Sequence, residues 1–179
     1  MAAAPVVLNL SPVRSDNFRN KPNLRSAWLP IACSLAFVCF TSSALMGGYH
    51  TQKVLDHVWR ALLGNWHTDL IGPVNGDSRK IGHFFGYGAI GLFFRRAWHI
   101  SLKAWAFVAG SKIAFYAASL GIASTFAVAS LDEWHQRFLP GRVGSFHDVL
   151  LDTCGALCLN LMLFAYRARK QSQIRAVPA

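Results

Sequence analysis

Side chains that could perform chemistry gather in two stretches of this sequence. In the first, Lys80, His83 and Tyr87 stand three and four positions apart, a spacing that places them on one face of a helix. His83 is the candidate catalytic residue, because an imidazole gains and loses a proton near physiological pH. Whether a reaction is catalysed stays open, since a hydrogen-bonded packing histidine would show the same spacing. The nearby pair Gly82 and Gly86 would let another helix approach closely.

The second stretch begins with Glu133 and Gln136, which lie three positions apart. Pro140-Gly141 predicts a turn after them, and Arg142 follows that turn. Because a guanidinium can bind an oxyanion through two parallel hydrogen bonds, Arg142 indicates recognition of an anionic group.

The second stretch then leads into a predicted helix. Ser145 and Asp148 have the capping-box form that begins a helix, and Asp152 and Gly155 fall on the same face as Asp148. Folded together, the two stretches would place their cations beside these carboxylates, under the outer headgroups. The predicted binding residues are Lys80, His83, Tyr87, Glu133, Gln136, Arg142, Ser145, Asp148 and Asp152.

A purely structural role for these charges is the alternative. Salt bridges among them could hold the helices in register, with Ser145 and Asp148 serving only as a helix cap. Four neighbouring residues are predicted to be solvated in a loop: Asp132, His135, Arg137 and His147.

Motifs for metals, nucleotides and hydrolysis are missing from the sequence. It contains no HExxH, no ordered Cys and His set, no GxSxG and no glycine-rich phosphate loop that opens a helix. The cysteines lie in apolar stretches and are predicted to pack there as small apolar residues: Cys33, Cys39, Cys154 and Cys158. We therefore predict no metal site and no cofactor.

The composition indicates a membrane protein. Of 179 residues, 53% are hydrophobic and 15% are charged, whereas soluble domains carry about 25% charged residues. A spanning helix needs about 20 apolar residues, and the predicted spans are 27–46, 81–98, 113–130 and 149–166. The second contains a short apolar run, for which a buried or re-entrant segment is the alternative. The expected fold is an all-α membrane bundle of four transmembrane helices.

The net charge of +10 would also suit a nucleic-acid-binding protein, but its distribution indicates membrane topology. With four spans, one side holds eleven cations and a single anion, as cytoplasmic segments do. These cations are Arg14, Arg19, Lys21, Arg25, Arg95, Arg96, Lys103, Arg167, Arg169, Lys170 and Arg175. Both termini are therefore predicted to be cytoplasmic, and nucleic acid is not an expected partner.

Three regions follow from these spans. A transmembrane domain at 27–166 is expected between polar cytoplasmic tails at 1–26 and 167–179. A cleaved signal peptide is the alternative for the first span, although its apolar run is longer than the usual 7–15 residues.

At its two polar stretches the sequence resembles the VanZ-like family of small multi-pass bacterial membrane proteins. The first family motif is matched by Lys80, His83 and Tyr87, and the second by Glu133, Gln136, Pro140, Gly141, Arg142, Ser145, Asp148 and Gly155. The resemblance covers about residues 77–166. Two positions depart from the family pattern: Arg79 stands where an Asp is usual, with the Asp displaced to Asp77, and Asp152 replaces an Asn.

The family's namesake is linked to teicoplanin resistance, so the resemblance implies an envelope role in the bacterial inner membrane and names no reaction. The expected function is recognition of an anionic envelope or lipid-linked group in an outward-facing polar pocket, with membrane lipids as surroundings. The alternative is a non-catalytic accessory subunit of a larger membrane protein complex.

Overall fold

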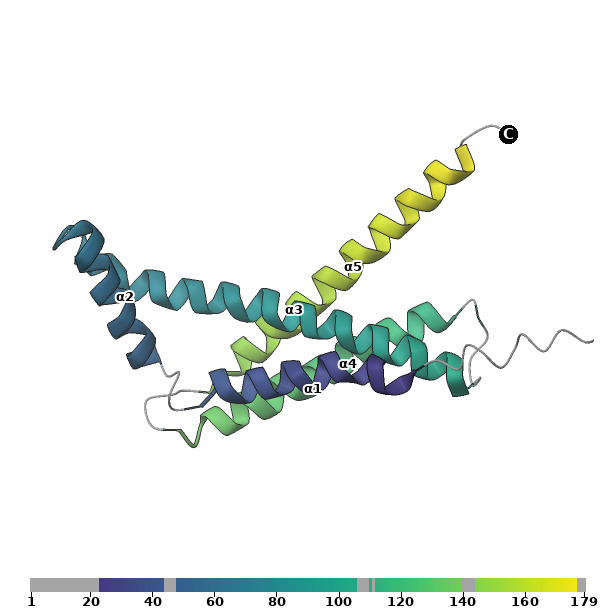
Figure 1. The fold of residues 1–179 in the computed structure, drawn as a ribbon, viewed down its shortest axis with the longest axis horizontal. Helices are drawn as coiled ribbons and strands as arrows, with labels where there is room; N and C mark the ends of the chain where they lie inside the picture. The colour runs from purple at the N-terminus through teal and green to yellow at the C-terminus, as the bar shows by residue number, and fades with distance from the viewer. Residues whose placement is uncertain (1–22, 44–47, 106–109, 111, 140–143, 177–179) are drawn as a thin grey trace, which may run out of the picture.

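The computed structural model describes residues 23–43, 48–105, 110, 112–139 and 144–176. Helices are the only regular elements within those ranges, which agrees with the all-α prediction. They are α1 (Leu24–Thr41), α2 (Gly48–Leu63), the 3-10 helix η3 (Thr68–Leu70), α3 (Ile71–Trp105), α4 (Ile113–Gln136) and α5 (Phe146–Ala176) (Figure 1).

The long helix α3 is the element around which the others pack. Its 35 residues correspond to a length of about 52 Å, and it contacts α1, α2, α4 and α5. In Figure 1, α1 and α4 run alongside α3, whereas α5 crosses it at an angle. The main core consists of Ala27, Ile31, Tyr87, Ile90, Phe94, Ala97, Ala129 and Val149.

Small residues let α4 and α5 approach α3 closely. A Cβ added at Gly91 would lie 2.7 Å from the Ala156 Cβ, and one at Gly121 would lie 2.9 Å from the backbone nitrogen of Arg95. Helices that meet through glycine can pack at nearly backbone separation. The predicted close approach at Gly82 and Gly86 is not observed, because an added Cβ at either position meets nothing within 4 Å.

A proline helps to attach α1 to α3. Pro30 has no N–H, so it leaves the Ser26 carbonyl, four residues earlier, without its helical donor. Arg96 of α3 donates to that carbonyl over 3.3 Å. Trp28 adds a second link through its indole N–H, which donates to the Ser101 hydroxyl over 3.2 Å.

Three helices are long and apolar enough to cross a membrane: α1, α4 and the Phe146–Arg175 segment of α5. The remaining predicted span, 81–98, lies in α3. This helix is not one of the three that are long and apolar enough to cross a membrane. Its mean hydropathy is lowered by glycines, His83 and the Arg95-Arg96 pair. Of these residues, Gly91 and Arg95 are buried against neighbouring helices, whereas Gly82 and Arg96 are exposed.

Two helices extend beyond their predicted spans. Residues 99–105, beyond the predicted span 81–98, are the last turns of α3, and residues 167–176, predicted as part of a tail, continue α5. Hydropathy marks where a helix stops being apolar, whereas Arg, Lys and Gln continue a helix readily. For the same reason the polar segment 48–63, for which no element was predicted, forms α2. Most of the predicted N-terminal tail lies outside the described residues.

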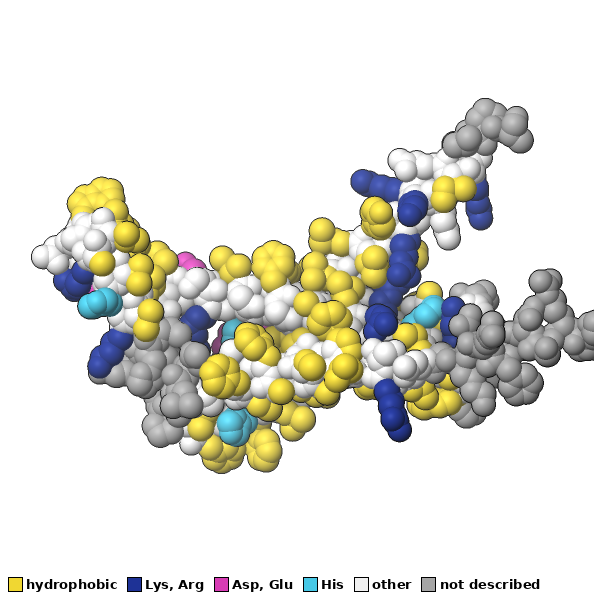
Figure 2. Space-filling model, in the orientation of Figure 1, with side chains coloured by type: hydrophobic (Ala, Val, Ile, Leu, Met, Phe, Trp, Pro, Cys, Tyr) yellow, Lys and Arg dark blue, Asp and Glu magenta, His cyan; other side chains and the backbone are white. Residues whose placement is uncertain are grey.

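The outer surface of the bundle is largely apolar. Figure 2 shows hydrophobic side chains over α1 and the middle of the bundle, with Lys and Arg along the C-terminal half of α5. All four cysteines lie in apolar helices, as predicted, but on exposed positions, so they do not pack against other helices of this chain. A thiol behaves as a small apolar group, which suits a surface facing lipid as well as a core.

Candidate functional site

A buried hydrogen-bond network joins α3 to the end of α4. The Tyr87 hydroxyl donates to Asp132 Oδ2 over 2.9 Å, and the Gln136 side-chain amide donates to the same oxygen over 3.0 Å. The amide also reaches the Ser42 hydroxyl of α1's C-terminal cap at 3.5 Å. The C-terminal ends of α1 and α4 and the middle of α3 therefore meet around the Asp132 carboxylate.

A second group of polar side chains joins α3, α4 and α5. His83 Nδ1 lies 3.4 Å from Asp152 Oδ2, and Glu133 offers a carboxylate oxygen to the same place. One potential ligand atom from each of these three residues lies within 4.8 Å of the other two. We call His83, Glu133 and Asp152 the three-helix cluster.

Two glycines position the cluster. A Cβ at Gly155 would collide with the Phe84 carbonyl, which adjoins His83, so α5 crosses α3 one residue from the cluster's histidine. A Cβ at Gly144 would collide with the backbone carbonyl of Glu133. The segment before α5 is thus pressed against the end of α4, and a side chain at either glycine would force these backbones apart.

Ser145 fixes the start of α5 next to the cluster. Its backbone N–H donates to Glu133 Oε2 over 2.8 Å, and its hydroxyl accepts from the His147 N–H over 3.2 Å. The second bond caps the helix, but the predicted capping box with Asp148 is not formed, because the Ser145 N–H donates to Glu133. The bond from the Ser145 N–H holds Glu133 Oε2 in place. Ser145 therefore both caps α5 and orients a carboxylate of the cluster.

Among the described residues, the buried carboxylates of this region have one basic neighbour, the His83 imidazole beside Asp152. Asp132 is 8% exposed, Glu133 is 4% exposed and Asp152 is fully buried. Within the described part of the chain, no Lys or Arg forms an ion pair with any of them. Burying a carboxylate is costly unless it is neutralised or paired, so the region favours a positively charged group.

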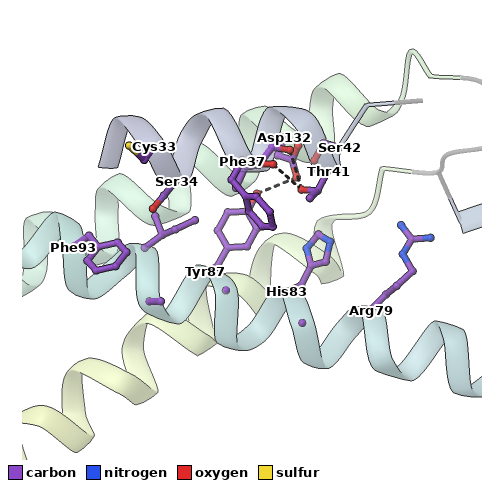
Figure 3. A pocket seen from close by; sticks show the side chains of 15 residues that line it. Cys33, Ser34, Phe37, Thr41, Ser42, Arg79, His83, Tyr87, Phe93 and Asp132 are labelled. Carbon is purple, nitrogen blue, oxygen red and sulfur yellow. Dashed lines mark hydrogen bonds between the residues drawn. The ribbon is translucent and has the colours of Figure 1, made fainter. Parts of the chain in front are cut away.

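A pocket of about 550 Å³ lies beside this network, between α1 and α3. Figure 3 shows Arg79 and His83 toward one end of the pocket and Phe93 and Cys33 toward the other. Tyr87 and Asp132 line its middle. The remaining lining residues are Ser34, Phe37, Val38, Thr41, Ser42, Gly82, Gly86, Ala89 and Ile90.

The structure brings together six of the nine predicted binding residues: His83, Tyr87, Glu133, Gln136, Ser145 and Asp152. Lys80 is exposed and makes no hydrogen bond or ion pair within the described chain. Asp148 is half-buried in the first turn of α5, and its carboxylate bonds to no described residue. Arg142, like the predicted Pro140-Gly141 turn, lies outside the described residues.

Asp132 was predicted to be a solvated loop residue, and this prediction is wrong. The apolar run ends at Ser130, but α4 continues to Gln136 and turns Asp132 toward Tyr87. Continuing the helical spacing from Ala129 would have found it, because positions 129, 132, 133 and 136 share one face. His135, Arg137 and His147 are exposed, as predicted, but His135 lies in α4 and His147 in α5 rather than in a loop.

Comparison with known proteins identifies one family. A sequence model described as VanZ/LLP1 matches residues 6–167, which include every residue of both polar groups. No curated protein and no solved structure matches the chain.

Proposed function

The chain belongs to the VanZ/LLP1 family of membrane proteins, and from this premise we propose that it binds an anionic lipid-linked group of the cell envelope. The proposed site is the pocket between α1 and α3. An anionic head would lie by Arg79 and His83, and the apolar chain would extend toward Phe93. No reaction is part of the proposal.

The observation that carries the proposal is the position of Arg79. It lines the pocket, is half-buried, and forms no ion pair or hydrogen bond within the described chain. Because no described residue accepts from it, the Arg79 guanidinium can donate its N–H groups to an oxyanion of a ligand. The buried carboxylates nearby would oppose an anion, so binding should depend strongly on Arg79.

The size of the pocket supports an amphiphilic ligand. Its lining residues on α3 run from Arg79 to Phe93, a distance of about 21 Å along a helix. Half of a hydrocarbon core is about 15 Å thick, so the pocket is long enough to follow a lipid through one leaflet. Its far part is lined by Phe37, Ile90 and Phe93, which suit an acyl or prenyl chain.

The outward orientation of the pocket belongs to the same proposal. Because α3 packs along α4, whose length and hydropathy suit a membrane span, we propose that α3 is the fourth span. The charge distribution then places both termini in the cytoplasm of a bacterial inner membrane. Arg79 and His83 precede the apolar part of α3, so they would lie toward the outer surface.

The pocket can be blocked without disturbing the helix packing. Gly86 lines the pocket, and a Cβ there meets nothing within 4 Å, so Gly86→Leu should fill the space. Gly76→Leu is the matched control, because Gly76 is on the same helix, is equally open, and does not line the pocket.

Binding is measured by native mass spectrometry of the purified protein in detergent. The probes are a polyprenyl phosphate, phosphatidylglycerol and phosphatidylcholine. Wild type and Gly76→Leu should bind the anionic lipids in preference to phosphatidylcholine, and Gly86→Leu should bind them at least about tenfold more weakly. Arg79→Gln should lose the preference, since a charge-assisted hydrogen bond contributes about 1.5–3 kcal/mol. Lys103→Gln, which removes a cation elsewhere on α3, should keep it.

Equal binding by Gly86→Leu and wild type would contradict the proposed pocket. A wild type that binds all three lipids equally would contradict the anionic specificity.

A second candidate function is docking in a larger membrane complex. The C-terminal half of α5 leaves the bundle (Figure 1) and exposes Leu161, Met162 and Phe164 by 58%, 66% and 66%. Such a face suits a neighbouring subunit as well as lipid. Leu161→Lys with Phe164→Lys would release a stably bound subunit on size-exclusion chromatography, whereas a lipid-facing helix would show no change in mass.

A further inference from the structure

The three-helix cluster holds donor atoms that proteins use to bind metal ions. His83 comes from α3, Glu133 from α4 and Asp152 from α5, and their potential ligand atoms lie within 4.8 Å of one another. His83 is partly accessible, with 29% of its side chain exposed, and it also lines the pocket. The two carboxylates are buried.

One atom of the cluster lacks a partner that its burial would require. Asp152 is fully buried, and its Oδ1 has no hydrogen-bond partner in the part of the chain that the structure describes. Buried polar atoms are nearly always hydrogen-bonded, and an exception requires a specific explanation such as a bound ion. Among the described residues, His83 is the only basic side chain paired with Asp152, and no Lys or Arg pairs with Asp152 or Glu133.

The spacing of the donors fits a small divalent ion. Zinc binds imidazole nitrogen and carboxylate oxygen at about 2.0–2.2 Å, so two ligands of a tetrahedral site lie about 3.4 Å apart. His83 Nδ1 and Asp152 Oδ2 are 3.4 Å apart. Glu133 is held by the Ser145 N–H through one oxygen, an outer contact of the kind that orients metal ligands.

We propose that His83, Glu133 and Asp152 bind one divalent transition-metal ion, of the class of Zn²⁺ or Mn²⁺, at the polar end of the pocket. One imidazole with two carboxylates is a mixed nitrogen and oxygen set, which suits these ions better than thiolate-seeking metals. Three protein ligands leave at least one coordination position open. Because His83 borders the pocket, that position lies where a water or a ligand oxygen can reach the ion.

The sequence analysis placed these three residues in one predicted binding site but predicted no metal there, because they do not form a local metal-binding motif. His83 and Asp152 are separated by 69 positions, and metal motifs recognised from sequence depend on short, regular spacings. The crossing of α5 over α3 at Gly155 and the extension of α4 beyond Ser130 bring the ligands together.

The test uses the full chain, purified in detergent with a tag that contains no histidine and without added lipid. The protein is stripped with a chelator and then equilibrated separately with Zn²⁺ and with Mn²⁺. Bound ion is measured by mass spectrometry of the metal, and Mn²⁺ also by electron paramagnetic resonance. Wild type should bind one ion, and Asp152→Asn and His83→Gln should each weaken binding by at least about tenfold.

A matched control comes from a surface pair of the same chemistry. His67 Nδ1 lies 3.9 Å from Asp69 Oδ1, with both side chains exposed, so Asp69→Asn removes a histidine–carboxylate pair outside the cluster. Asp69→Asn should bind the ion as wild type does. Equal affinity in Asp152→Asn and wild type would overturn the proposal.

A measurement on wild type alone covers the case in which the variants do not fold. A ligand that binds the folded state raises the unfolding temperature as its concentration increases. Zn²⁺ or Mn²⁺ should therefore raise the unfolding temperature of wild type, and a chelator should reverse the shift. No shift with either ion, together with no bound metal, would overturn the proposal independently of the lipid result.

Discussion

Replacing Gly155 with alanine should separate α3 from α5 at the centre of the site. The added Cβ would lie 2.9 Å from the carbonyl carbon of Phe84 and 3.2 Å from its Cα. Carbon atoms pack at about 3.5–4.0 Å, so the two backbones must move apart by roughly half an ångström or more. Neither contact is with a flexible side chain, so the helices themselves must shift.

The magnitude follows from two opposing effects. Overpacking a well-packed core typically costs about 1–3 kcal/mol, and the collision with backbone at Gly155 favours the upper end of that range. Alanine gains about 1 kcal/mol over glycine in helix propensity. We expect Gly155→Ala to lower the free energy of unfolding by about 2 kcal/mol, from these two values. Gly86→Ala is the control, because its Cβ meets nothing within 4 Å and only the propensity gain applies.

Unfolding by sodium dodecyl sulfate in mixed micelles, followed by circular dichroism, measures both variants. The expected difference between them is about 3 kcal/mol. Because Asp152 lies one turn before Gly155 and His83 adjoins Phe84, Gly155→Ala should also weaken Zn²⁺ binding, whereas Gly86→Ala should not. If Gly155→Ala is as stable as Gly86→Ala, the close crossing of α3 and α5 is refuted.

Two further predictions test the network and the topology. Tyr87→Phe removes a buried hydrogen bond of 2.9 Å to Asp132 and should lower the free energy of unfolding by about 1.5–3 kcal/mol, the value for a charged acceptor; an unchanged stability would show that the bond contributes nothing. Reporter fusions after Trp105 and at the C-terminus should both indicate the cytoplasm, and a periplasmic signal from either would contradict the four-span proposal.

Local features of the site were predictable from the sequence. His83 and Tyr87 share a face of α3 because they are four positions apart, and Ser145 caps α5 because its hydroxyl can reach the N–H of the first turn. Glu133 and Gln136 were paired by the same helical spacing. Each of these relations spans less than two helical turns, so local geometry is sufficient to establish it.

The errors have physical causes too. Asp132 was assigned to a loop because charge follows the apolar run at Ser130, yet a charged residue does not end a helix. Its burial depends on Tyr87, which comes from another helix. Gly82 and Gly86 have the small-residue spacing of a helix contact, but they face the pocket, and Gly155 and Gly91 make the close approaches instead.

The sequence by itself determined that this chain is a helical membrane protein with two polar stretches. Hydropathy and helical periodicity are properties of consecutive residues, so they need no knowledge of which helices meet. The sequence analysis assigned His83, Glu133 and Asp152 to one predicted site with six other residues, and the tertiary structure decided that these three donor groups meet in one cluster. That contact depends on where α5 crosses α3, and the crossing is set by steric fit at Gly155 against the backbone of Phe84. No pattern along the chain encodes such a fit between segments so far apart.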